Sequence, residues 1–148
     1  MPTITEDKLA IQEIMYSYAL MVDNHRWYMM DNIFAPEAIV DYVSSGGQKG
    51  PYKETMAWLE RALKAWPLNL HFITNPIINI KGDTANSTVA YNAPMGKIEA
   101  DGSQFMMTNI GYYYDKWVRL NSEWRILDRV CDQTITIGGL PENYTIPT

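Results

Sequence analysis

Apolar residues at helical spacing mark the first element of the chain. They recur at intervals of three and four, on one face of a helix: Ile11, Ile14, Met15, Tyr18 and Val22. Thr3 is followed three residues later by Glu6, the spacing of a capping box at a helix N-terminus. The pattern therefore predicts an amphipathic helix over about residues 6–22.

Shorter apolar segments, separated by turn residues, follow this helix. A second short helix is expected over residues 25–34. Pro36 is expected to end it, because proline disfavours the helical conformation of the residue before it. Residues 37–43 are rich in β-branched and aromatic side chains and predict a strand. A Ser-Gly loop leads into a third helix over residues 52–66, which Pro67 ends.

The rest of the chain has the pattern of strands joined by tight turns. The predicted strands cover residues 68–74, 76–81, 84–95, 105–120 and 124–137. Asp101-Gly102 is a strong hairpin signal between the third and fourth of them. Helices followed by antiparallel strands predict an α+β fold with the helices on one face of the sheet. Such a layer arrangement can enclose a cavity, and the tail 138–148 could close it or pack on a neighbouring subunit.

Composition narrows the class of protein. A chain of 148 residues with 47% hydrophobic and 20% charged residues is typical of one globular domain, here taken as 1–148. The net charge of −5 argues against nucleic acid and against an anionic membrane surface as partners. The first residues have neither a basic nor an apolar signal segment, so we expect a cytoplasmic protein. Cys131 is the only cysteine and is expected to be a small buried residue.

Asp23 and His71 are the first candidates for chemistry. Asp23 falls at the predicted C-terminus of the first helix, where a carboxylate meets the negative end of the helix dipole. His71 lies 48 positions later (71 − 23), in a short apolar strand. A carboxylate beside an imidazole makes a general base with an orienting partner. His25 is the only other histidine and is read as structural or exposed.

Tyr18 and Arg129 are the next candidates. Tyr18 lies on the apolar face of the first helix, where core packing is the alternative to a role at a cavity. Arg129 belongs to an apolar row in the last strand, together with Leu127, Cys131, Gln133, Ile135 and Ile137. Parity places Ile126 on the opposite face of that strand. An arginine in such a row needs an acidic partner or an anionic ligand.

The chain resembles the SnoaL-like branch of the NTF2-like superfamily, specifically its lyase members. The resemblance covers residues 9–137 and is carried by three stretches: Ile11-Gln12-Glu13-Ile14-Met15 with Tyr18 and Val22-Asp23; His71-Phe72-Ile73-Thr74-Asn75 with Ile80-Lys81-Gly82-Asp83; and Trp124-Arg125-Ile126 with Arg129. Scytalone dehydratase, bile acid 7α-dehydratase and hexachlorocyclohexane dehydrochlorinase are members of this kind. The bile acid enzyme has a second aspartate on a mid-sheet strand, where this chain has Asn92 or Pro94 and no acid.

The resemblance implies a cone formed by a curved mixed or antiparallel sheet with three helices around a cavity. It implies a cofactor-independent lyase, such as a dehydratase, acting on a small hydrophobic alicyclic or polycyclic compound, with neither metal nor organic cofactor. Asp23 and His71 would be the catalytic pair, and Tyr18 and Arg129 would stabilise the oxyanion or the leaving group. It also implies a dimer or trimer. An isomerase or cyclase on the same fold and a non-catalytic ligand-binding or oxygenase-small-subunit-like module are the alternatives.

Overall fold

The computed structural model describes the whole chain, residues 1–148. It contains two α-helices, two short 3₁₀ helices and seven strands: α1 (Ile4–Asp23), η1 (Trp27–Asn32), β1 (Phe34–Asp41), η2 (Val43–Ser45), β2 (Lys49–Pro51), α2 (Tyr52–Leu63), β3 (Leu68–Asn69), β4 (Phe72–Lys81), β5 (Thr84–Ile98), β6 (Gln104–Leu120) and β7 (Glu123–Ile137). None of the helices has the length and apolar character required to cross a bilayer.

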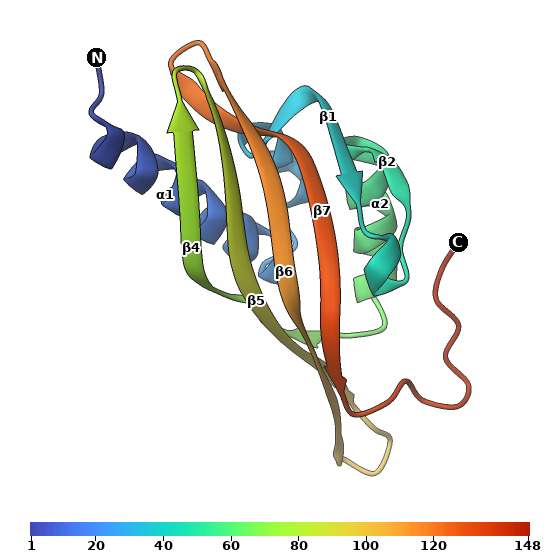
Figure 1. Cartoon of the computed structure of the whole chain (residues 1–148). Coiled ribbons are helices and arrows are strands. Elements are labelled where there is room, and N and C mark those ends of the chain that lie inside the picture. Colours follow the sequence, from blue (N-terminus) through green and yellow to red (C-terminus); the bar gives the residue numbers. More distant parts are fainter.

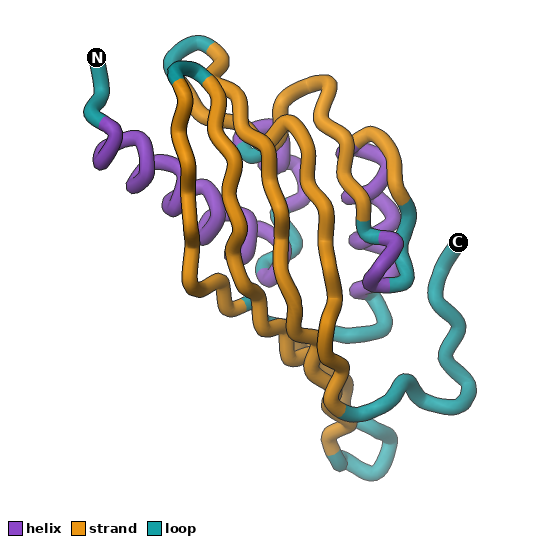
Figure 2. The backbone as a smooth tube through the Cα atoms, viewed as in Figure 1, coloured by secondary structure: helices purple, strands orange, loops and turns teal.

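All seven strands form one curved sheet in the order β2-β1-β7-β6-β5-β3, with β4 also paired to β5. The β1–β7 pair is parallel and the other pairs are antiparallel, so the sheet is mixed. Both α-helices lie on the same side of the sheet (Figure 1), and the strands bend around them (Figure 2). The predicted α+β class, with helices on one face of a curved mixed sheet, is confirmed.

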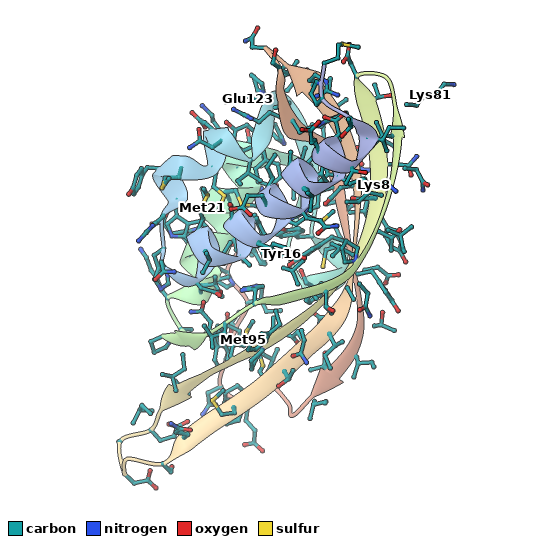
Figure 3. All side chains as sticks on the ribbon, turned by 90° about the vertical axis from the view of Figure 1, so that its left-hand side faces the viewer. Lys8, Tyr16, Met21, Lys81, Met95 and Glu123 are labelled. Carbon is teal, nitrogen blue, oxygen red and sulfur yellow. The ribbon has the colours of Figure 1, made fainter.

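The N-terminal helix forms as the sequence indicates. Thr3 and Glu6 make both hydrogen bonds of the capping box, so α1 begins slightly before the predicted boundary. The stripe predicted from periodicity faces the sheet, and Ile11, Met15 and Val22 are buried in the core. Figure 3 shows α1 lying along the sheet, with the long β5–β6 hairpin extending beyond it. The C-terminal end of α1 is thereby brought next to the start of β4.

Two predicted helices are shorter than expected. The segment predicted as a helix over 25–34 is the 3₁₀ helix Trp27–Asn32, and Phe34 already belongs to β1. Phe34 pairs with Ile126 of β7, so sheet formation outweighs the local helical pattern there. The helix predicted over 52–66 ends at Leu63, and the chain then turns toward β3.

The face predicted for the last strand is wrong at several positions, because β7 carries two bulges. The register between β6 and β7 shifts between Lys116 and Trp117, because β7 has one extra residue, Leu127, opposite them. As a result, Ile126 and Arg129 are both buried. A second shift lies between Ile110 and Gly111. Each bulge reverses the alternation of inward and outward side chains. The remaining apolar members of the predicted row, Ile135 and Ile137, are therefore exposed.

Candidate functional site

A cavity of about 290 Å³ lies between the concave face of the sheet, α2 and the C-terminal tail. Of its 23 lining residues, 16 are hydrophobic, and five are tyrosines: Tyr18, Tyr42, Tyr91, Tyr113 and Tyr144. No aspartate, glutamate, lysine or arginine lines it. His71 is thus the one lining side chain that can carry a positive charge. An aromatic wall with few polar groups is typical of sites for small apolar ligands.

Asp23 and His71 are paired at this cavity. The Oδ1 atom of Asp23 lies 2.7 Å from Nδ1 of His71, and its Oδ2 accepts a hydrogen bond of 2.9 Å from the His71 backbone N–H. The two side chains are only 6% and 7% exposed, respectively. Because Nδ1–H donates to the carboxylate, the Nε2 atom of the neutral ring is the acceptor. Two contacts to one carboxylate fix both the position and the tautomer of the imidazole.

A break in the strand makes this pairing possible. The segment predicted as one strand over 68–74 is divided into β3 and β4, and His71 lies between them. Its backbone N–H is therefore free to bond Asp23 rather than a neighbouring strand. The carboxylate at the C-terminus of α1 costs about 0.3–1 kcal/mol against the helix dipole. The two hydrogen bonds from His71 offset that cost.

Tyr18 lines the cavity together with a partner that the sequence did not indicate. Its hydroxyl lies 2.5 Å from the hydroxyl of Tyr42, which follows β1. Both side chains are buried, and burial raises the pKa of Tyr18 and holds the pKa of Tyr42 well above its ordinary value. The pair therefore stays protonated and can donate a hydrogen bond to an oxygen in the cavity.

Arg129 does not line the cavity. Its Nε and Nη2 atoms donate to the two carboxylate oxygens of Asp115, each at 2.7 Å, and both side chains are almost fully buried. Burial opposes the charge, but Asp115 outweighs it and keeps the pKa of Arg129 well above its ordinary value. The guanidinium lies 4.4 Å from the ring centre of Tyr18 and 4.2 Å from that of Tyr113. The structure contains the acidic partner, one of the two alternatives expected from the sequence, and Arg129 is not among the residues that line the cavity.

The remaining candidates are placed as follows. His25 is exposed beside Trp27, away from the cavity, in agreement with the sequence interpretation. Cys131 is buried and lines the cavity, and its thiol contacts the Tyr91 hydroxyl at 3.4 Å. Asn92 is exposed and faces away from the cavity. No three histidine, cysteine, aspartate or glutamate side chains are gathered as metal ligands.

Sequence reasoning missed Tyr42, Tyr91 and Tyr113. Tyr42 shares the parity of the buried Val40 and continues that face past the end of β1. The rings of Tyr91 and Tyr113 come from neighbouring strands and stack at 4.6 Å between centres. The ten tyrosines of the chain were the only signal for them, and that number indicates no positions.

The fold and the paired residues define an α+β cone of the NTF2-like type with an acid–histidine pair at its cavity. Residues 3–130 match the SnoaL-like domain, and the chain belongs to that family. A curated relative, the uncharacterised protein Rv2910c of Mycobacterium tuberculosis, is 34% identical over 124 residues, which cover 84% of this chain and 83% of that protein.

Solved structures share the fold at lower identity. The protein Kfla4162 of Kribbella flavida superposes with a TM-score of 0.80 at 20% identity, over 90% of this chain and 95% of that chain. A type 2 hexachlorocyclohexane dehydrochlorinase, LinA, superposes with a TM-score of 0.74 at 15% identity, over 93% and 95% of the two chains. These likenesses concern the fold.

Proposed function

We propose that this protein is a cofactor-independent lyase, of the dehydratase type, that acts on a small hydrophobic ring compound. The observation that carries the proposal is the double hydrogen bond from His71 to Asp23 at the wall of an open aromatic cavity. A filled cavity or separated side chains would have favoured a non-catalytic module. The SnoaL-like family membership and the fold shared with a dehydrochlorinase support the same conclusion.

The reaction begins with proton abstraction. The Nε2 atom of His71 removes a proton from the carbon next to a carbonyl, and Asp23 stabilises the resulting imidazolium through Nδ1–H. The electron pair of the broken C–H bond moves into an enolate, whose oxygen accepts a hydrogen bond from the Tyr18–Tyr42 pair. Collapse of the enolate forms the C=C bond and breaks the bond to a β-hydroxyl group. That group takes the proton from His71 and leaves as water.

The first step can be measured without knowing the natural substrate. The ketone 4-(4-methylphenyl)cyclohexanone, incubated with the protein in D₂O, should exchange its α-hydrogens for deuterium, as followed by NMR. Asp23→Asn removes the charge that stabilises the imidazolium but keeps the size of the side chain. We expect it to slow exchange by at least about 100-fold. His25→Gln changes the exposed histidine and should have no effect.

Exchange at the wild-type rate in Asp23→Asn would refute the catalytic pair. The elimination step needs a second probe, the 3-hydroxy derivative of the same ketone. Formation of the conjugated enone, followed by its ultraviolet absorbance, is the result expected of a lyase. A third probe, the β,γ-unsaturated ketone cyclohex-3-enone, tests the alternative: migration of its double bond into conjugation, without loss of water from the hydroxy ketone, would instead assign the protein to the isomerases.

A further inference from the structure

A polar group on the sheet lines the same cavity as His71. It consists of Asn109 on β6 with Gln133 and Thr136 on β7, and all three side chains line the cavity. Gln133 and Thr136 are three positions apart and would face opposite ways in a regular strand. The bulge opposite Ile110 and Gly111 inserts one residue between them and turns both inward. The bulge therefore brings these two side chains to Asn109.

A chain of hydrogen bonds orients the Asn109 amide. Gln133 Nε2 donates to Thr136 Oγ1 at 3.0 Å, and Thr136 Oγ1 donates to Asn109 Oδ1 at 3.3 Å. This arrangement commits the carbonyl side of the amide to the sheet. The Nδ2 side meets only the sulfur of Met95, at 3.7 Å, and a thioether is a weak acceptor. A strong donor therefore remains available at the cavity wall.

The sheet register gives the distance between this donor and the general base. The pairs Asn69–Met95 and Phe72–Asn92 align His71 with Ala93 on β5. Ala93 in turn pairs with Asn109, and Asn109 pairs with Thr136. His71 and Asn109 thus belong to one row, two strand spacings or roughly 10 Å apart along the sheet. The small side chain of Ala93 lies between them and leaves room for a ring.

We infer that Asn109 determines specificity for an oxygen at the far end of the substrate from the carbon that His71 deprotonates. The substrate class is then a neutral ring compound with two oxygens besides the leaving hydroxyl group, because no aspartate, glutamate, lysine or arginine lines the cavity to bind a permanent ion. One oxygen activates the C–H bond and meets the tyrosine pair. The other, a hydroxyl or carbonyl, accepts a hydrogen bond from Asn109 Nδ2. This inference rests on the proposed function for the identity of the base.

Two probes of equal shape test the inference. The first, 4-(4-hydroxyphenyl)cyclohexanone, carries the distal oxygen, and the second, 4-(4-methylphenyl)cyclohexanone, has a methyl group in its place. Titration calorimetry should show that the wild-type protein binds the hydroxyl probe about tenfold more tightly, the discrimination expected of one neutral hydrogen bond. Asn109→Leu should abolish this preference while leaving the affinity for the methyl probe unchanged. Asn109→Ala repeats the test should Asn109→Leu fail to fold.

The controls separate this role from a structural one and from catalysis. Thr108→Val changes the neighbouring side chain on β6, which does not line the cavity, and should keep the preference. A general loss of packing would weaken both probes equally, whereas loss of a specific donor affects one. A preference that persists in Asn109→Leu, or that Tyr42→Phe removes instead, would overturn the inference. Absence of deuterium exchange with the preference intact would refute only the proposed function, and exchange without any preference would refute only the role of Asn109.

Discussion

Tyr18 and Tyr42 differ from the Asp23–His71 pair in what they can do. Burial raises the pKa of both Tyr18 and Tyr42, so neither serves as a base near neutral pH. Their hydroxyls lie 2.5 Å apart, and when one donates to the other, the second proton remains for an oxygen in the cavity. A donor placed where negative charge develops acts mainly in the transition state.

Tyr42→Phe should therefore lower the rate of α-hydrogen exchange more than the affinity for the ketone. Loss of one oxyanion donor reduces turnover by about 10²–10³-fold in known enzymes, and we expect about 10²-fold here because Tyr18 remains. The measurement is the rate of deuterium incorporation at saturating 4-(4-methylphenyl)cyclohexanone. Tyr144→Phe is the matched control, because its ring also lines the cavity and its hydroxyl makes no hydrogen bond within the protein. Equal effects of the two substitutions would contradict a specific donor role for Tyr42.

Among the elements, β6 and β7 form the support beneath the tyrosines. Asp115 on β6 pairs with Arg129 on β7, and the guanidinium packs between the rings of Tyr18 and Tyr113. Its Nη1 atom has no protein hydrogen-bond partner. Arg129 is therefore placed to position Tyr18 and to add positive charge beneath it, although it does not line the cavity itself.

Removing either member of this buried ion pair should be costly. Asp115→Leu leaves an unpaired buried cation, and Arg129→Met leaves an unpaired buried anion, so each should lower the free energy of unfolding by about 3–5 kcal/mol. The double variant removes both charges and should lose much less than the sum of the two. Urea unfolding of the four proteins measures this coupling. Additive losses would show that the pair does not act as a unit.

The elements also show what the sequence could and could not predict. Helical periodicity and the capping box defined α1, and the Asp-Gly turn located the β5–β6 hairpin. The bulges in β7 left no such signal, because a bulge depends on the register with the partner strand. Gly111 is a partial clue, since a Cβ there would lie 2.1 Å from the Asp132 carbonyl oxygen. Strict alternation of side chains along β7, which takes no account of bulges, placed Ile135 on the inward face. It gave no reason to expect a hydrogen bond between Thr136 and Asn109.

At the site, the Asp23–His71 spacing predicted a pair that the structure brings into contact. The catalytic role of that pair stays a prediction, as do those of Tyr18 and Arg129. Tyr42 could not be connected to Tyr18 from sequence, because 24 positions and a change of element separate them. Contacts between elements depend on the curvature of the sheet, which local patterns do not encode.

On the scale of the molecule, two attachments hold the layers around the cavity. At one end, Asp7 of α1 accepts two hydrogen bonds of 2.8 Å from Arg119 and one of 3.0 Å from Trp124. At the other, Trp58 of α2 donates to the Pro147 carbonyl at 2.8 Å, which holds the tail against the cavity. The first attachment fixes α1 on the sheet and so supports the position of Asp23 at its far end.

The hydrogen bonds from Arg119, and then that from Trp124, hold the pKa of Asp7 below its ordinary value of 3.8. Because the pKa is lower in the folded state, the stabilisation is complete above the unfolded value and is lost as the pH falls through the folded one. Asp7→Asn should therefore lower the free energy of unfolding by about 1–3 kcal/mol at pH 7. The difference from the wild type should shrink at about pH 3, where unfolding of the wild-type protein takes up a proton. Urea unfolding at the two pH values measures both effects.

Asp83→Asn is the matched control for this prediction, because Asp83 also pairs with Arg119, at 2.9 Å. Its side chain is 79% exposed, and an exposed ion pair contributes about 0–1 kcal/mol. Each substitution removes a carboxylate charge that faces the same arginine, but Asp7 is buried and accepts three hydrogen bonds, whereas Asp83 is exposed and accepts one. A loss at Asp83 as large as that at Asp7, or a loss at Asp7 that does not diminish in acid, would contradict the assigned role. If Asp7 anchors α1 as described, Asp7→Asn should also slow deuterium exchange by the ketone probe, since any shift of α1 displaces Asp23 from His71.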